Sequence, residues 1–157
     1  MLEHPLQGHY RQWAIEALKL SPLFGCLTPN DRETVLTHGK LFVYRAQEVI
    51  IQEGTVPDCF FLLIKGEAAV TVLSGKHPVE VGRISSPNIF GEMGLLLRHA
   101  RTATVLASEE IIALRFHHRA FDLMLDGIQG FARQLSVTLA QRLAKLPAVH
   151  HCQRPLQ

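Results

Sequence analysis

The stretch from Phe90 to Thr104 contains residue types that can bind an anion. Gly91 and Gly94 let the backbone approach a ligand closely, and the amides at the start of a short helix present partial positive charge to it. Arg101 and Glu92 belong to the same stretch. A guanidinium binds phosphate with two parallel hydrogen bonds, whereas a carboxylate only accepts hydrogen bonds and therefore suits a neutral hydroxyl. The pattern predicts a ligand that carries both a phosphate and a hydroxyl group.

This stretch resembles the phosphate-binding cassette of the cyclic nucleotide-binding domain family. The likeness rests on Phe90-Gly91-Glu92, a short apolar run, and then Arg101-Thr102-Ala103-Thr104 at the family spacing. By motif position, it implies that Glu92 binds the ribose 2′-hydroxyl and that Arg101 binds the cyclic phosphate. The binding set that it implies consists of Gly91, Glu92, Met93, Gly94, Arg101, Thr102 and Ala103.

The chain departs from the family pattern at three positions. Ala100 stands where proline often precedes the arginine, which loosens the loop but removes no ligand group. Gln47 and Asn88 stand where glycines are usual. Asparagine tolerates a positive φ, so Asn88 is a mild change, whereas Gln47 predicts a turn that is built differently.

Residues 40–118 contain short runs of β-branched and aromatic residues that are separated by turn residues. The turns recur at short intervals, which favours an antiparallel roll over a parallel sheet with crossover helices. The family resemblance extends over this region through Glu53-Gly54, Asp58 and the run from Phe60 to Gly66. The predicted strands are Leu41–Tyr44, Glu48–Gln52, Cys59–Lys65, Glu67–Leu73, Val79–Ile84, Ala103–Leu106 and Ile111–Phe116.

Helical patterns flank this region on both sides. An amphipathic helix is predicted from Tyr10 to Leu20, and a second begins at the N-cap Thr28 and ends near His38. After the roll, a helix over residues 119–126 breaks at Gly127 and Gly130. A longer helix follows, with a stripe at Phe131, Leu135, Leu139, Leu143 and Leu146, and Pro147 ends it.

These patterns predict a single, mainly β domain: an antiparallel jelly-roll-like β-roll with N-terminal helices and a C-terminal helix pair. Its segments are an N-terminal helical part (1–39), the roll (40–118) with the cassette at 90–104, the C-terminal helices (119–147) and a disordered tail (148–157). A chain of 157 residues with 47% hydrophobic content can bury one core of this size.

Composition argues against several classes of partner. The net charge of +2 gives no basic field for nucleic acid, and no apolar run approaches the roughly 20 residues of a membrane span. Only about ten residues remain beyond Pro147, so we expect no helix-turn-helix after the last helix. Cys26, Cys59 and Cys152 are odd in number and widely spaced, so we expect reduced thiols in a cytoplasmic protein.

The sequence lacks the common catalytic signatures. It has no Gly-x-Ser-x-Gly elbow, no glycine loop ending in Gly-Lys-Ser/Thr and no His-Glu-x-x-His. A cupin-like enzyme would need converging histidines, and adjacent His117 and His118 would face opposite sides of a strand. We therefore expect no enzyme activity, no metal and no cofactor.

The resemblance implies a sensor that binds a cyclic nucleotide without chemistry and signals by movement of the C-terminal helices. Bacterial adenine binders and eukaryotic guanine binders both carry a residue like Thr102 after the arginine, so cAMP is favoured over cGMP on breadth of use alone. The last helix can cover the base, with Leu139, Leu143 and Leu146 as a possible lid. The alternative is an empty pocket on a protein-interaction module, in which this helix binds an effector or a second copy.

Overall fold

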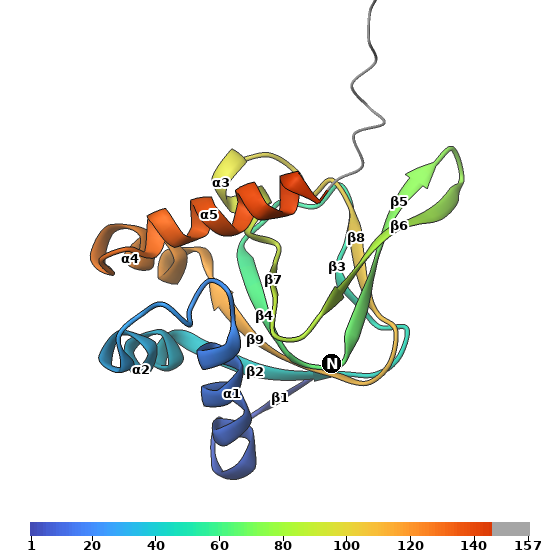
Figure 1. The fold of residues 1–157 in the computed structure, drawn as a ribbon. Coiled ribbons are helices and arrows are strands. Elements are labelled where there is room, and N and C mark those ends of the chain that lie inside the picture. The colour runs from blue at the N-terminus through green and yellow to red at the C-terminus, as the bar shows by residue number, and fades with distance from the viewer. Residues whose placement is uncertain (146–157) are drawn as a thin grey trace, which may run out of the picture.

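Two antiparallel sheets pack against each other and form the β-roll shown in Figure 1. The computed structural model describes residues 1–145. The first sheet has the order β1 (Leu2–His4), β2 (Gly39–Tyr44), β9 (Ile111–His117), β4 (Cys59–Lys65) and β7 (Ile89–Phe90). The second has the order β3 (Val49–Ile51), β8 (Thr104–Ala107), β5 (Glu67–Ser74) and β6 (His77–Ser85). The predicted jelly-roll-like fold is confirmed.

Within residues 1–145, five helices flank the roll. α1 (Gly8–Leu20) and α2 (Pro29–His38) precede β2, and the short α3 (Glu92–Leu97) lies between β7 and β8. α4 (His118–Gly127) and α5 (Phe131–Ala144) follow β9, as the orange and red helices of Figure 1 show. None of the helices within residues 1–145 is long and apolar enough to cross a bilayer.

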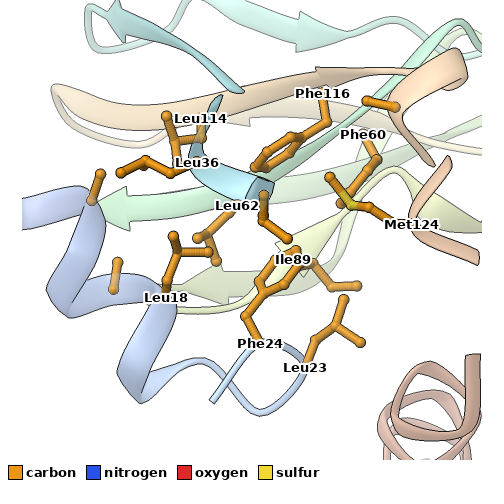
Figure 2. Close-up of a cluster of buried hydrophobic side chains, with 14 of the residues drawn as sticks. Leu18, Leu23, Phe24, Leu36, Phe60, Leu62, Ile89, Leu114, Phe116 and Met124 are labelled. Atoms are coloured by element: carbon orange, nitrogen blue, oxygen red, sulfur yellow. The ribbon is translucent and has the colours of Figure 1, made fainter. Parts of the chain in front are cut away.

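Strand β4 lies between two hydrophobic cores, which explains its uninterrupted apolar sequence. Successive side chains of a strand point to opposite faces. Phe60 and Leu62 pack with the helices in the cluster of Figure 2, whereas Phe61 and Leu63 pack between the two sheets. Since neither face of β4 meets solvent, all of its residues before Lys65 are buried.

The helix boundaries follow local capping chemistry. The amide of Asp31 donates to Thr28 Oγ1 at 3.1 Å, so the predicted N-cap of α2 is confirmed. α4 ends at Gly127, and Gly130 caps α5 with a φ of +82°. The predicted break between the last two helices is therefore also confirmed.

The structure corrects three sequence-based predictions. Gln47 has a φ of +70°, so the backbone keeps a left-handed conformation without glycine and the prediction of a differently built turn is wrong. Asn88 does not have a positive φ; its side chain and its amide both donate to the Ser85 carbonyl. The rings of His117 and His118 do not point apart, because His118 begins a helix, and their centroids lie 4.2 Å apart.

Strands β1 and β7 were not predicted. They contain three and two residues, too few to show an alternating pattern. The disordered tail, Leu146 and Pro147 lie outside the described residues. The division of the domain into segments stays a prediction.

Candidate functional site

A cavity of about 540 Å³ lies between the second sheet and the segment that contains α3. This volume falls in the range of small-molecule sites, which is about 300–1,000 Å³. One wall is apolar and comes from four strands. Its residues are Ile51, Val70, Val81, Ile84 and Val105. The opposite wall is polar and includes the cassette, together with Arg142 of α5.

Gly91 places the backbone close to the cavity. Its φ is +84°, and an added Cβ would lie 3.0 Å from Ile51 Cδ1 and 3.1 Å from Arg101 Nη1. Both the conformation and the space therefore require glycine. The chain turns here from β7 into α3, and Glu92, the first residue of α3, becomes buried in the cavity wall with 1% of its surface exposed.

Arg101 is fixed by backbone carbonyls. Its Nη1 donates to the Gly91 carbonyl at 2.6 Å, and its Nη2 donates to the Cys59 carbonyl at 2.5 Å. Its own amide donates to the Thr55 carbonyl, and its carbonyl accepts from the Gly54 amide. Because a guanidinium has five N–H donors, these contacts orient the group and leave donors for an anion in the cavity.

Burial raises the pKa of Glu92 above its ordinary value of 4.5, and the positive charges of Arg142 and Arg101 partly offset this rise. Arg142 Nη1 donates to Glu92 Oε1 and forms an ion pair with it. Its Nη2 donates to the Ile89 carbonyl. The arginine thus joins α5 to the first turn of α3 and to β7.

Positive charge predominates around the cavity. Glu92 is the one carboxylate among the described lining residues, whereas the cationic side chains are Arg83, Arg101, Arg142 and Lys145. Arg83 is paired with Glu67 and Glu80 outside the cavity. The remaining excess of positive charge favours an anionic ligand.

The cassette residues predicted from the sequence come together here. All seven line the cavity: Gly91, Glu92, Met93, Gly94, Arg101, Thr102 and Ala103. Of the possible lid residues, Leu139 and Leu143 do not line it. Leu139 packs against the helical core, Leu143 is 68% exposed, and Leu146 lies outside the described residues.

Arg142 was not predicted from the sequence. The buried face of α5 runs through Phe131, Leu135 and Thr138, at spacings of four and three, and the next step of four reaches Arg142. A charged residue on an otherwise buried helix face was the signal that could have identified it.

No group of three or more metal-ligating side chains occurs among residues 1–145. Cys26 and Cys59 are free thiols, and burial raises the pKa of Cys59 to about 11. A thiol with such a pKa is protonated and unreactive at neutral pH.

Comparison with known proteins decides the family. The model of the cyclic nucleotide-binding domain matches residues 41–127, which is more than half of the chain. The chain belongs to the cyclic nucleotide-binding domain family. The matched residues include the whole cassette. They begin within β2 and reach the end of α4, so every element from β3 through α4 is covered in full.

Curated relatives of this cyclic nucleotide-binding domain include a cyclic nucleotide-gated potassium channel of Rhizobium etli, 30% identical over 136 residues. They also include the cAMP-dependent protein kinase regulatory subunit of Colletotrichum orbiculare, 30% identical over 117 residues. These matches cover 87% and 74% of this chain but 36% and 29% of the relatives, so the chain spans about a third of their length.

Solved structures share the fold of the domain. The regulatory domain of Toxoplasma gondii PKA with cAMP superposes with a TM-score of 0.73 at 21% identity, over 87% of this chain and 51% of that one. The catabolite activator protein of Thermus thermophilus gives a TM-score of 0.72 at 23% identity, over 78% and 58%. The predicted relation to the catabolite activator and kinase regulatory type is confirmed.

Proposed function

We propose that this domain is a sensor that binds a cyclic nucleotide without chemical conversion. The observation that carries the proposal is that Glu92 and Arg101 line one cavity of suitable size, with an apolar wall facing them. A phosphate would bind Arg101 and the amides from Gly91 to Gly94. The ribose 2′-hydroxyl would donate to Glu92, and the base would lie against the apolar strands.

Among cyclic nucleotides, cAMP is the proposed ligand, with cGMP as the second candidate. The kinase relatives are named for dependence on cAMP, and the Toxoplasma gondii domain was solved with cAMP. Thr102 lines the cavity directly after Arg101 and does not decide between the two bases.

The output in this proposal is movement of α4 and α5. Arg142 connects α5 to the cavity wall, and Gly130 separates the two helices with a backbone conformation that glycine adopts easily. If the helix has two arrangements, a ligand shifts the equilibrium between them only as far as it binds one arrangement more tightly than the other. The partner that detects the movement would be an effector protein or a second copy, in the cytoplasm and without contact to nucleic acid.

Calorimetric titration with cAMP and with cGMP tests the ligand. Charge-assisted hydrogen bonds contribute about 1.5–3 kcal/mol each, so loss of a two-pronged contact in Arg101→Ala should weaken binding by roughly two to four powers of ten. Because Arg101 is buried and binds two carbonyls, Arg101→Lys is a second variant that keeps the charge. The Arg101→Lys protein should fold, and it should bind the nucleotide roughly ten- to a hundredfold more weakly, because lysine keeps the charge but cannot make the two-pronged contact.

Arg98→Asn is the matched control. Arg98 is an exposed arginine of the same loop with a φ of +54°, which asparagine tolerates, and it does not line the cavity. Its variant should bind as the wild type does. Equal affinity of wild type and Arg101→Lys would refute the placement of the phosphate.

A second candidate function is an interaction module with an empty pocket. The observation that favours it is the apolar surface of α5, on which Val137 is 39% exposed and Leu143 is 68% exposed. If the folded wild type binds neither nucleotide, this function replaces the sensor.

A further inference from the structure

A second cavity, of about 450 Å³, lies between α3, the loop that follows α3, and α4. Its volume also falls in the range of small-molecule sites, which is about 300–1,000 Å³. Half of its lining residues have apolar side chains: Val56, Pro57, Leu95, Ala100 and Phe121. Phe121 also belongs to the helical core, with 2% of its surface exposed. The second cavity therefore reaches from the surface to a rigid apolar base.

Polar groups of both charge signs line the rest of the second cavity. They are Arg98, His99, His118 and Asp122. Among residues 1–145, neither Arg98 nor Asp122 forms an ion pair. The guanidinium of Arg98 is therefore available to a ligand, and Asp122 is the one carboxylate of the described lining.

The backbone at Arg98 gives a separate reason to assign a role to its side chain. Arg98 caps the C-terminus of α3 with a φ of +54°, and its amide donates to the Gly94 carbonyl at 3.0 Å. Helices usually place glycine in this left-handed position, because a side chain makes it unfavourable. Residues held in such a conformation are concentrated at ligand sites and active sites.

We propose that the second cavity is a binding site for a small carboxylate with an apolar body, and that Arg98 binds the carboxylate group. The planar guanidinium matches a carboxylate with two parallel hydrogen bonds, and the apolar side chains contact the body of the ligand. A single negative charge suits this lining better than a phosphate does, because Asp122 opposes the charge of Arg98. The site differs from the nucleotide cavity and does not require that a nucleotide binds.

The two cavities share a wall at α3. Gly94 and His99 line both of them. A Cβ added at Gly94 would lie 3.0 Å from Pro57 Cβ, in the lining of the second cavity, and 3.3 Å from Arg101 Nη1, in the lining of the first. A carboxylate in the second cavity therefore contacts the same helix as a ligand in the first. Each ligand should change the affinity for the other by the same factor, a link that rests on the proposed function.

The first experiment needs no nucleotide. Amide chemical shifts of the protein are followed by NMR during titration with octanoate, with neutral 1-octanol and with octylammonium, which share one apolar body. Octanoate should cause saturable shifts at Leu95, Arg98 and Phe121, and it should bind at least about threefold more tightly than the other two. Equal affinity for octanoate and 1-octanol would overturn the proposal. Absence of saturation, or shifts confined to Val81 and Ile84 of the first cavity, would also overturn it.

Three variants test the contribution of charge to octanoate binding. Arg98→Asn should bind octanoate roughly three- to tenfold more weakly, and asparagine tolerates the positive φ. Asp122→Asn removes the opposing charge and should bind it about threefold more tightly. Asp126→Asn is the matched control, because Asp126 is exposed on the same helix and does not line the second cavity. Affinity equal to that of the wild type in Arg98→Asn, or no gain in Asp122→Asn, would overturn the proposal.

The link between the cavities is tested by repeating the octanoate titration with saturating cAMP. The affinity for octanoate should change about fivefold or more in the wild type. A smaller change would overturn the link. A wild type that binds octanoate but neither cAMP nor cGMP would refute the proposed function, whereas the site in the second cavity would be supported.

Discussion

At the residue scale, the site contains a carboxylate, Glu92, whose burial disfavours its charged form. Burial raises the pKa of Glu92, and the two neighbouring arginines recover only part of that cost. The folded protein therefore holds a proton on Glu92 more tightly than the unfolded chain does. The buried carboxylate is thus maintained at the expense of stability.

This cost predicts a pH-dependent gain in stability for Glu92→Gln. Because the folded-state pKa is raised, the stability that Glu92 contributes is fully present below its ordinary value of 4.5 and is lost as the pH rises through the folded-state pKa. Glu92→Gln does not titrate, so its free energy of unfolding should exceed that of the wild type at pH 8 and approach it near pH 4. Urea denaturation at both values measures the difference.

Glu109→Gln is the control for this prediction, since it makes the same change at an exposed position. Its free energy of unfolding should follow that of the wild type at both pH values. A Glu92→Gln protein that is less stable than the wild type at pH 8 would show that the ion pair with Arg142 outweighs the burial of the charge.

At the element scale, the turn from β7 into α3 sets the geometry of the cassette. Gly91 is both left-handed and closely surrounded, whereas Gly54 has the same φ of +84° and no atom within 4 Å of an added Cβ. Comparing alanine variants of Gly54 and Gly91 therefore separates the loss of stability due to the backbone conformation from the loss due to the close contact.

Gly54→Ala should lower the free energy of unfolding by about 1–2 kcal/mol, which is the cost of a left-handed conformation for an L-residue. Gly91→Ala should lower it further, because its Cβ would lie against Ile51 and Arg101. It should also weaken cAMP binding, since the Arg101 guanidinium would have to move. Urea denaturation and calorimetry of both variants measure the two effects. Equal losses of stability would show that the Ile51 side chain moves away from the added methyl group without a cost in stability.

Some elements could be predicted from the sequence better than others. The run in β4 and the cap at Thr28 are local signals, and both predicted their elements well. The face of α5 was predicted less well, because a stripe through Leu139 and Leu143 and a stripe through Thr138 and Arg142 both fit helical spacing. Only packing against the roll decides between them: it buries Thr138 and brings Arg142 to the cavity, while Leu139 keeps a contact with the helical core and Leu143 is left 68% exposed. Ion pairs between distant segments, such as Glu92 with Arg142, carry no local signal.

At the scale of the whole molecule, α5 is the C-terminal helix that contributes a residue, Arg142, to the cavity. It follows the roll in the sequence and lies beside α3 (Figure 1). Arg142 links it to α3, and Gly130 precedes it at the junction with α4. α1, by contrast, packs in the helical core on the first sheet and contributes no residue to the cavity. The two helices should therefore respond differently to ligand.

Hydrogen exchange of backbone amides measures this response. Amides of α5 that exchange only when the domain opens and releases its ligand should exchange up to about a hundredfold more slowly when the cAMP concentration is about 100 times the dissociation constant. The amides of α1 that exchange by local opening should change little. In Arg142→Ala the slowing in α5 should shrink, because the carboxylate no longer joins the helix to the ligand. Equal slowing of α1 and α5 in both proteins would mean that the ligand stabilises the whole domain without acting through α5.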